Sequence, residues 1–334
     1  MPAIGTLSQA LDNLYTTTWY HQKGSVIDQI FDAAPFWFWL KSKGKLRTEE
    51  GGRFITEPLQ YAKTDNIKWI GKGSTVPLND FEFLTISQWQ WRYLVASLVR
   101  YQVDDQQNRG KMQIINYMNA KQDNVKDALV DEMETMLFGG SGAVTGSGTL
   151  ETNPRPDGLQ VLVPDDPTSA VTVGGIPQNS YSWWQSKALN MTGKSFATYG
   201  VSYMRTMINN QSNNRKQDRP DLIMSGQTPY EYYEDTILPA YRISNNKLGD
   251  MGFDNIQYKG IPMVWSPTCA NTRMYMLNTN YFQFVYDPIM FFDMTEWKTI
   301  PNQPGDKAAQ IMTACTLLTG RRRVQGVLHT IDTP

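Results

Sequence analysis

Residues 88–103 read QWQWRYLVASLVRYQV, and residues 111–138 read KMQIINYMNAKQDNVKDALVDEMETMLF. In the first stretch every odd position except Ser97 is apolar or aromatic, whereas the even positions include three Gln and two Arg. Alternation with a period of two predicts a long strand with one face in the core and the other largely in water. We therefore expect the odd positions, from Trp89 to Val103, to face the core.

The second stretch has the pattern of one long amphipathic helix. Its apolar side chains recur every three or four residues, and charged side chains occupy many of the remaining positions. We expect Gly139-Gly140 to end the helix, because glycine is common just past a helix C-terminus. At 1.5 Å per residue the helix would be roughly 40 Å long, about the width of a domain.

The segment before the strand, 51–87, predicts an extended hairpin. Gly51-Gly52 opens it, and the arms are expected at 53–61 and 67–70, followed by a looser return. The segment reads as polar on both sides, without an apolar face. Because an isolated two-stranded hairpin is only marginally stable in water, we expect this one to rest on a neighbouring molecule.

Upstream of the hairpin, residues 1–23 have few apolar anchors and predict an extended arm. Residues 25–34 have the spacing of a short helix, which Pro35 is expected to end. Far downstream, the Gly-, Ser- and Pro-rich stretch 140–158 predicts a linker at a domain boundary.

After the linker, strand and helix patterns alternate, which predicts an α/β region. The chain then closes with two β segments, at 308–318 and 322–331. These segments need a sheet partner, and the strand at 88–103 is the natural candidate. The first region of the chain would then be completed by the last, with the α/β region inserted between them.

Composition narrows the class of protein. The chain of 334 residues has 31 basic and 32 acidic residues, and a net charge of −1 gives no global attraction to nucleic acid or anionic membrane. With only Cys269 and Cys315, a disulfide framework and a zinc cluster are excluded. No apolar run approaches the roughly 18 residues of a membrane span, and the N-terminus lacks a secretory-signal pattern. We expect a soluble chain.

The sequence offers little for catalysis. Residues 188–195, ALNMTGKS, fit a permissive phosphate-loop pattern, but the residues before them do not resemble the buried strand such a loop follows. Only two histidines, His21 and His329, occur, and nothing places either beside a nucleophile. Arg321-Arg322-Arg323 could touch a phosphate backbone, although a strand edge or an intersubunit salt bridge explains it more simply. We predict no enzyme activity, no cofactor and no metal site.

The order of elements resembles a tailed-bacteriophage major capsid protein. The resemblance spans most of the chain in order, and no single motif is diagnostic alone. Its motifs are Gly51-Gly52, EPLQY at 57–61, SQWQW at 87–91, QNRG at 107–110, DALVDEME at 127–134, LQV at 159–161 and VGGI at 173–176.

The resemblance implies the Hong Kong 97-type fold, of class α+β. Residues 1–50 would form the N-terminal arm and short helix, and 51–87 the extended two-stranded loop. The peripheral domain with its long spine helix would comprise 88–139 and 306–334. The inserted axial α/β domain would be 140–305.

The resemblance also implies the partners. Many copies would form hexamers and pentamers that close an icosahedral shell around double-stranded DNA, contacted weakly and without sequence specificity. Since the chain lacks a long charged N-terminal extension, scaffolding is expected from a separate protein or from a segment already removed. A portal protein is expected too, and decoration proteins are possible partners. The protein would belong to the virion, assembled in the host cytoplasm.

Charge adds a hypothesis about contacts between copies. Residues 53–72 carry four basic and two acidic residues, whereas 122–138 carry five acidic residues and one lysine. We predict that the loop lies across a neighbour's spine helix, with apolar contacts dominating and ion pairs setting the register. The contact residues would be Phe54, Lys63, Lys68, Trp69, Ile70 and Lys72 of the loop, and Asp127, Asp131 and Glu134 of the helix.

Three other classes stay open at this point. An encapsulin-like nanocompartment shell would share the fold and enclose cargo enzymes instead of DNA. An NTPase would use Gly193, Lys194 and Ser195. A carbohydrate- or nucleic-acid-binding module would stay monomeric at high concentration.

Overall fold

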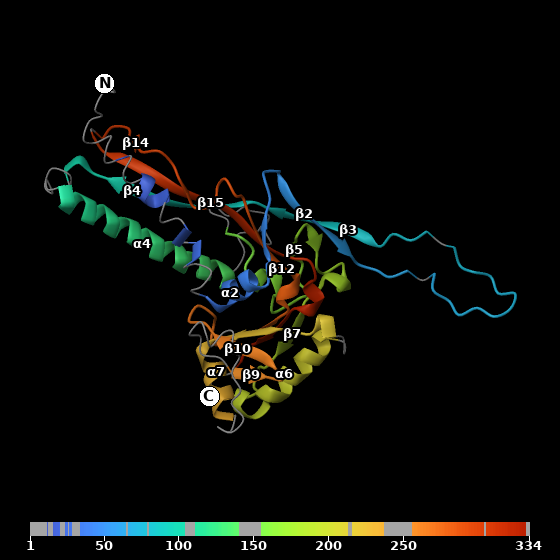
Figure 1. Ribbon diagram of the computed structural model, residues 1–334. Helices are drawn as coiled ribbons and strands as arrows, with labels where there is room; N and C mark the ends of the chain where they lie inside the picture. Colours follow the sequence, from blue (N-terminus) through green and yellow to red (C-terminus); the bar gives the residue numbers. More distant parts are fainter. Residues whose placement is uncertain are drawn as a thin grey trace.

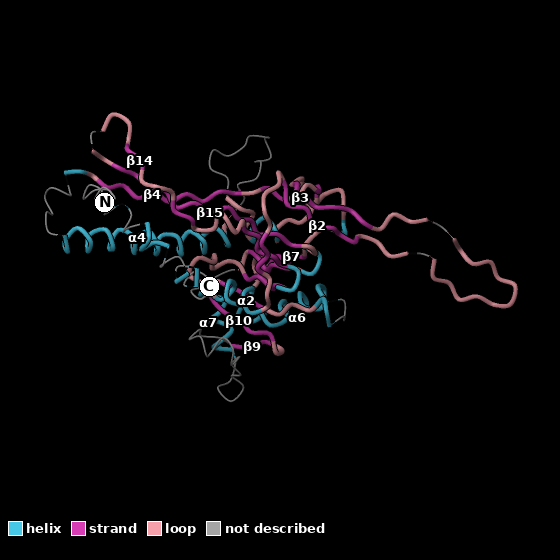
Figure 2. Tube along the Cα trace, turned by 45° about the horizontal axis from the view of Figure 1, so that its top comes forward, coloured by secondary structure: helices cyan, strands magenta, loops and turns pink. Residues whose placement is uncertain are grey.

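A computed structural model shows an α+β chain with two six-stranded sheets among its described residues (Figure 1). A long helix runs along one sheet, and a hairpin projects from the opposite side of the body (Figures 1 and 2). The structure describes residues 12, 16–20, 24–25, 27–28, 34–64, 66–78, 80–103, 111–139, 155–212, 216–236, 256–303 and 305–331.

The central strand of the first sheet is β15. It pairs antiparallel with β4, from Arg92 opposite Cys315 to Arg100 opposite Lys307, which confirms the predicted pairing of 308–318 with 88–103. Its other edge pairs with β12, β13 and β14, and β1 pairs parallel with β12. The strands are β1 (Leu46–Thr48), β4 (Arg92–Arg100), β12 (Phe282–Tyr286), β13 (Asp293–Met294), β14 (Lys298–Thr299) and β15 (Lys307–Thr319).

The long helix α4 (Lys111–Phe138) has the predicted bounds and lies along β4. Its last turns are anchored in the core, where Leu129, Met133 and Leu137 are buried. Farther toward its N-terminus, Lys121 Nζ donates to the carbonyl of Val99 in β4 at 3.0 Å. The helix is therefore attached to the sheet at more than one point along its length.

The predicted strand 88–103 is two strands, and the prediction of its core face is wrong for most of its length. β3 (Leu84–Gln90) ends at Trp91 and β4 begins at Arg92. Trp89 and Trp91 are buried as expected, but the faces exchange after Trp91, as they do when a strand pattern slips by one residue. In β4 the odd side chains Tyr93 and Val95 are 61% and 46% exposed, while Leu98 is buried.

The hairpin also differs from its prediction. β2 (Phe54–Gln60) pairs antiparallel with β3, so the return arm is 84–90 and not 67–70. The base does have an apolar face, because Ile55, Leu59 and Trp89 are buried. These three side chains explain why the pairing stops where it does, since the residues beyond the base lack such an anchor.

The N-terminal segments are helical where an extended arm was predicted. Residues 16–20 form a helical turn, and Trp19 Nε1 donates to the carbonyl of Phe292 at 3.0 Å. In the predicted helix 25–34, residues 25, 27 and 28 are helical, and residues 26 and 29–33 lie outside the described residues.

Pro35 begins a helix, α2 (Pro35–Ser42), and does not end one. Proline suits the first helical position, where its missing N–H costs no hydrogen bond. The helix is buried against the first sheet. The Phe36 ring meets that of Phe282 edge-on at 5.7 Å, and the Trp37 ring meets that of Phe284 at 5.1 Å.

The second sheet forms a smaller α/β layer below the first (Figure 1). Helices α6 (Phe196–Ser212) and α7 (Gln227–Thr236) pack against it. Its last strand in the chain is β16, so the prediction that 322–331 pairs with 88–103 is wrong. In spatial order the strands are β7 (Lys187–Asn190), β16 (Gly326–His329), β11 (Met274–Leu277), β8 (Leu222–Ser225), β10 (Ile261–Trp265) and β9 (Ile256–Tyr258).

Short elements lie between the longer helices and strands. A one-turn helix, η5, carries the chain from β15 to β16. The short elements are α5 (Leu159–Leu162), β5 (Thr172–Val173), β6 (Ile176–Pro177), η1 (Ser182–Trp184), η2 (Lys216–Asp218), η4 (Thr279–Tyr281) and η5 (Arg322–Val324).

The division into arm, loop, peripheral domain and axial domain stays a prediction. Two parts of the chain belong to a different sheet from the one that this division implies. Strands β12, β13 and β14 lie within 140–305 but belong to the first sheet, and β16 lies within 306–334 but belongs to the second.

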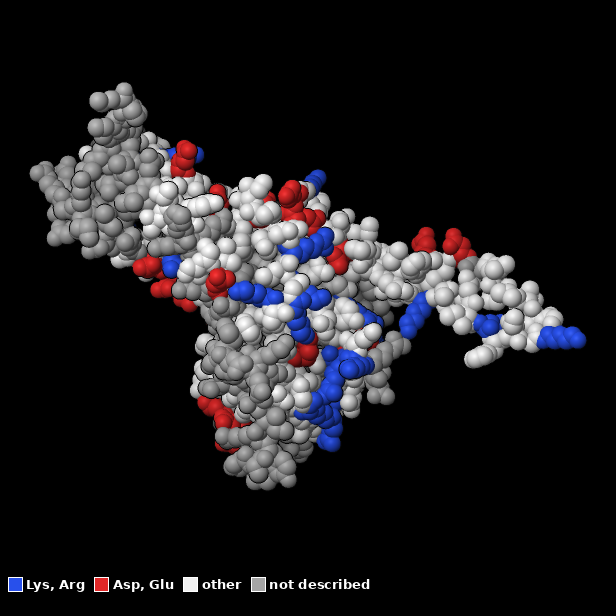
Figure 3. All heavy atoms as spheres, in the orientation of Figure 1, with Lys and Arg blue, Asp and Glu red and all other residues white. Residues whose placement is uncertain are grey.

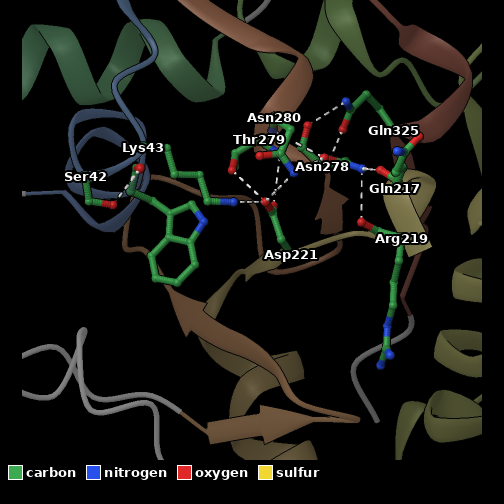
Figure 4. Close-up of polar contacts among 10 residues, drawn as sticks. Ser42, Lys43, Gln217, Arg219, Asp221, Asn278, Thr279, Asn280 and Gln325 are labelled. Atoms are coloured by element: carbon green, nitrogen blue, oxygen red, sulfur yellow. Dashed lines mark hydrogen bonds and ion pairs between the residues drawn. The ribbon is translucent and has the colours of Figure 1, made fainter.

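A polar network joins the layers at the start of β8 (Figure 4). The Asp221 carboxylate accepts hydrogen bonds from the Thr279 backbone N–H and hydroxyl, each at 2.9 Å. It also forms an ion pair with Lys43 at the end of α2. Beside it, Asn278 is buried and exchanges hydrogen bonds with the Gln325 side chain at 2.8 and 3.0 Å. Contacts between residues 47 to 178 positions apart in sequence thus meet at one point.

We expect Asp221→Ala to lower the free energy of unfolding by about 2–4 kcal/mol, because it leaves a buried N–H and the Lys43 ammonium without their acceptor. Urea unfolding of the unassembled chain measures this. The matched control is Lys41→Ala, which removes a pair with the exposed Asp28 and should cost less than about 1 kcal/mol. Equal losses in the two variants would contradict the importance of the network.

Candidate assembly surface

The projecting part of the hairpin, residues 61–83, has many exposed apolar side chains. The prediction of a polar hairpin is therefore wrong in composition, and the need for a neighbouring molecule stays a prediction. Trp69 is fully exposed. Contiguous exposed apolar surface is typical of sites that bind another molecule. The exposed apolar residues of the segment are Ile67, Trp69, Ile70, Val76, Leu78, Phe81 and Phe83.

The base holds this segment in a defined direction. Tyr61 donates its backbone N–H to the carbonyl of Phe83 at 3.1 Å and its hydroxyl to that of Glu82 at 2.9 Å. On the other face, the backbone N–H of Gln88 donates to the carbonyl of Gly174 at 2.9 Å. A Cβ at Gly174 would lie 2.9 Å from the Trp89 ring, and its φ of +60° also favours glycine. The turn at Gly174 thus fits closely against the hairpin.

The predicted loop residues fall into two groups. Lys63, Lys68, Trp69, Ile70 and Lys72 are all exposed on the projecting segment. Phe54 instead lies at the base, partly buried, with the Arg53 guanidinium 5.2 Å from its ring centre. The first group is available to another molecule, and Phe54 is only partly so.

The predicted helix residues also divide. Asp127 and Asp131 are exposed on α4, four residues apart and therefore on one face. Glu134 is partly buried, and its Oε1 accepts a hydrogen bond from Ser266 Oγ at 2.6 Å. Glu134 thus already has a partner within its own chain.

The loop and the acidic face of α4 lie on opposite sides of the same chain (Figures 1 and 2). Figure 3 shows carboxylates gathered along α4, and Lys and Arg side chains on the hairpin and below its base. The two surfaces could meet only between copies. The contact itself stays a prediction.

A further apolar surface was missed by the sequence pattern. The outward face of β4 exposes Tyr93 and Val95 because the strand faces exchange at Trp91. The alternating sequence pattern did show that these side chains share one apolar face, but it led us to predict that this face lies in the core. An exposed apolar sheet face is a second candidate surface for contact with other chains.

The phosphate-loop pattern at 188–195 does not form a phosphate cradle. Its first three residues are in β7, and the next form a tight turn in which the Lys194 N–H donates to the carbonyl of Met191 at 2.9 Å. The Lys194 ammonium lies 5.3 Å from the Tyr199 ring centre. A phosphate loop instead leaves its backbone amides free to surround the phosphates.

The other reactive side chains are placed as structural residues. Cys269 and Cys315 are buried, and burial raises the pKa of each thiol to about 12, so both stay protonated and unreactive near neutral pH. Within the described ranges, no three His, Cys, Asp or Glu side chains gather as a metal site would require. His21 lies outside the described residues, and His329 contacts the Thr330 hydroxyl at 3.0 Å.

In that same part of the chain, no helix has the length and apolar character needed to cross a bilayer.

Comparison with known proteins identifies the fold. No family model and no curated protein sequence matches. The cyanophage A-1(L) capsid asymmetric unit matches with a TM-score of 0.62 and 14% identity, over 87% of this chain and 91% of that one. A chain of the satellite phage P4 procapsid, which includes size determination (Sid) protein, matches at 0.53 and 10% identity, over 93% and 91%. The capsid of Myoviridae phage XM1 matches at 0.51 and 10% identity, over 87% and 91%.

These matches cover nearly the whole chain, and together with the long helix and projecting hairpin they show the Hong Kong 97-type capsid fold. The predicted fold class is confirmed. Identities this low establish the fold alone.

We expect Trp69→Ala to leave the free energy of unfolding within about 0.5 kcal/mol of wild type and to weaken assembly strongly, because this side chain touches little in its own chain. Urea unfolding and particle yield measure the two effects. Trp89→Ala is the control, since its side chain is buried at the base and its loss should cost about 3–5 kcal/mol. Normal particles from Trp69→Ala would reject the role of the tip.

We expect the combined reversal of Lys63, Lys68 and Lys72 to Glu to impair assembly while the chain stays folded. All three side chains are exposed, so the change removes attraction to another copy and little within the chain. The charge-preserving replacement of all three by Arg should assemble normally. Unaltered particle yield from the Glu variant would reject the ion-pair hypothesis.

Proposed function

We propose that this chain is a major capsid protein that self-assembles into the hexamers and pentamers of an icosahedral phage head enclosing double-stranded DNA. The observation that carries the proposal is the exposed apolar hairpin on a chain with a capsid fold. In a monomer, Trp69 and its apolar neighbours would remain in water. In a shell, each copy would cover the hairpin of the next.

The energetics favour association through apolar contact. Burying a large apolar side chain contributes about 1.5–3 kcal/mol, and the segment 61–83 has seven such exposed side chains. Exposed ion pairs contribute only about 0–1 kcal/mol each. The lysines of the loop would therefore fix the register of neighbouring copies, and the apolar side chains would supply most of the affinity.

The remaining partners follow from the proposed role. A separate scaffolding protein would guide curvature, a portal protein would occupy one vertex, and decoration proteins could add to the outer surface. A net charge of −1 fits weak contact with packaged DNA that lacks sequence specificity. The protein would be a virion component assembled in the host cytoplasm.

We expect the purified protein, alone or co-expressed with its scaffolding protein, to form closed particles of megadalton size, which sedimentation and electron microscopy measure. A variant with 66–78 replaced by a short Gly-Ser turn should stay small yet folded, because the base of the hairpin retains its own apolar contacts. A wild-type chain that stays monomeric at high concentration under both conditions would overturn the proposal. Particles that enclose enzyme cargo would favour an encapsulin-like shell instead.

A further inference from the structure

A pocket of about 590 Å³ lies beneath the base of the hairpin. It is formed by the end of β2, the residues just after it, and the chain around η1 and η5. No residue of α4 lines it. The side chains used below are Tyr61, Lys63, Trp183, Tyr281, Arg321 and Arg323.

The pocket has more positive than negative charge. Arg321 Nη1 and Arg323 Nη2 bond the two oxygens of one buried carboxylate, Asp218, at 2.7 and 3.0 Å. One carboxylate cannot neutralise two guanidinium groups, so one positive charge remains. Lys63 adds another at the rim. The acidic wall residue Glu57 shares the Arg47 guanidinium with Glu49, at 2.9 and 3.0 Å, so its negative charge offsets part of this excess.

The two guanidinium groups retain unused donors. A guanidinium has five N–H donors, and Arg323 has Asp218 as its one hydrogen-bonding partner among the described residues. Arg321 also donates to the Tyr281 hydroxyl at 3.1 Å and lies 5.5 Å from that ring's centre. Both groups are part-exposed, so the free donors are open to an acceptor from outside the chain.

The walls hold these groups in place before any ligand arrives. Arg322, between them in sequence, is buried, and its Nε and Nη2 donate to the Leu162 carbonyl and to Gln178 Oε1 at 2.9 and 2.8 Å. This anchor fixes η5. The rings of Tyr61 and Trp183, which also line the pocket, stack with their centres 5.5 Å apart. A pocket with fixed donors binds an anion with little loss of conformational freedom.

We infer that this pocket binds carboxylates on α4 of a second copy, in particular those of Asp127 and Asp131. This inference rests on the proposed function and adds contact residues outside the loop. The two carboxylates are exposed and one turn apart, about 6 Å. Their spacing suits two adjacent guanidinium groups. They also lie on the helix that the loop lysines are predicted to contact, so Lys63 and the arginines would form one continuous positive surface.

The test is a double-mutant cycle on assembly of the full chain. Arg323→Gln removes the charge yet leaves Asp218 bonded to Arg321, and Asp131→Asn removes its proposed partner. Each single variant should raise the protein concentration needed for half-maximal particle formation about fivefold. The double variant should behave like either single variant, because both remove the same contact.

Matched controls separate this contact from general effects. Lys194→Gln and Asp235→Asn remove exposed charges elsewhere and should assemble like wild type. Arg323→Lys keeps the charge but loses the planar guanidinium, so it should recover part of the assembly lost in Arg323→Gln, whereas an Arg323→Lys variant as impaired as Arg323→Gln would show that charge plays no part. Thermal unfolding of each unassembled variant checks that the chain is folded.

The outcomes are distinct. If the wild-type chain forms particles, two results would overturn the pocket assignment alone. In the first, Arg323→Gln and Asp131→Asn assemble normally. In the second, the fold-changes in assembly concentration of the two single variants multiply in the double variant. Normal assembly of Arg323→Gln with reduced retention of DNA would assign the pocket to phosphate and also overturn it. A wild-type chain that forms no particles would overturn the proposed function, and the pocket assignment with it.

Discussion

The pairing of β4 with β15 is the contact on which the rest of the structure depends. It joins residues 92–100 to 307–315, more than 200 positions away in sequence. The same pairing supports α4 on one side and the strands β12 to β14 on the other edge. Closing so long a loop costs conformational entropy that local contacts cannot offset early in folding. The first sheet is therefore complete only when both ends of the chain are present.

This arrangement separates the residues that stabilise the chain from those available for assembly. The buried side chains Ile55 and Trp89 hold the base of the hairpin, whereas Trp69 at its tip contributes almost no buried area. An exposed side chain such as Trp69 can be substituted without affecting folding, whereas a buried side chain such as Trp89 cannot. The assembly surface is thus built on a rigid support but is not itself part of the core.

The sequence predicted the elements that depend on local pattern, and it failed where tertiary packing decides. The helix α4 follows from local periodicity and is confirmed. The pairing of β15 with β4, expected because the closing β segments needed a sheet partner, is also confirmed, whereas the same expectation for 322–331 is wrong. The face of β4 was wrong because alternation shows that two faces differ, but not which one a helix will cover. Among site residues, the exposure of the loop lysines was predictable. The hydrogen bond from Ser266 to Glu134 was not, since the two residues are 132 positions apart. The arginine pocket was hidden for the same reason, because Asp218 is remote in sequence from Arg321.

Weak charged contacts of the kind proposed between copies would suit a closed shell. Each copy in a shell makes the same contacts many times, so a small free energy per contact becomes large for the whole particle. Strong contacts would trap misplaced subunits, whereas weak ones allow a subunit to leave and rebind in the correct register. Apolar contact from the hairpin tip is non-directional and cannot select a register alone. Directional donors such as those of Arg321 and Arg323 are suited to that role, because a guanidinium donates paired hydrogen bonds to a carboxylate only in particular geometries.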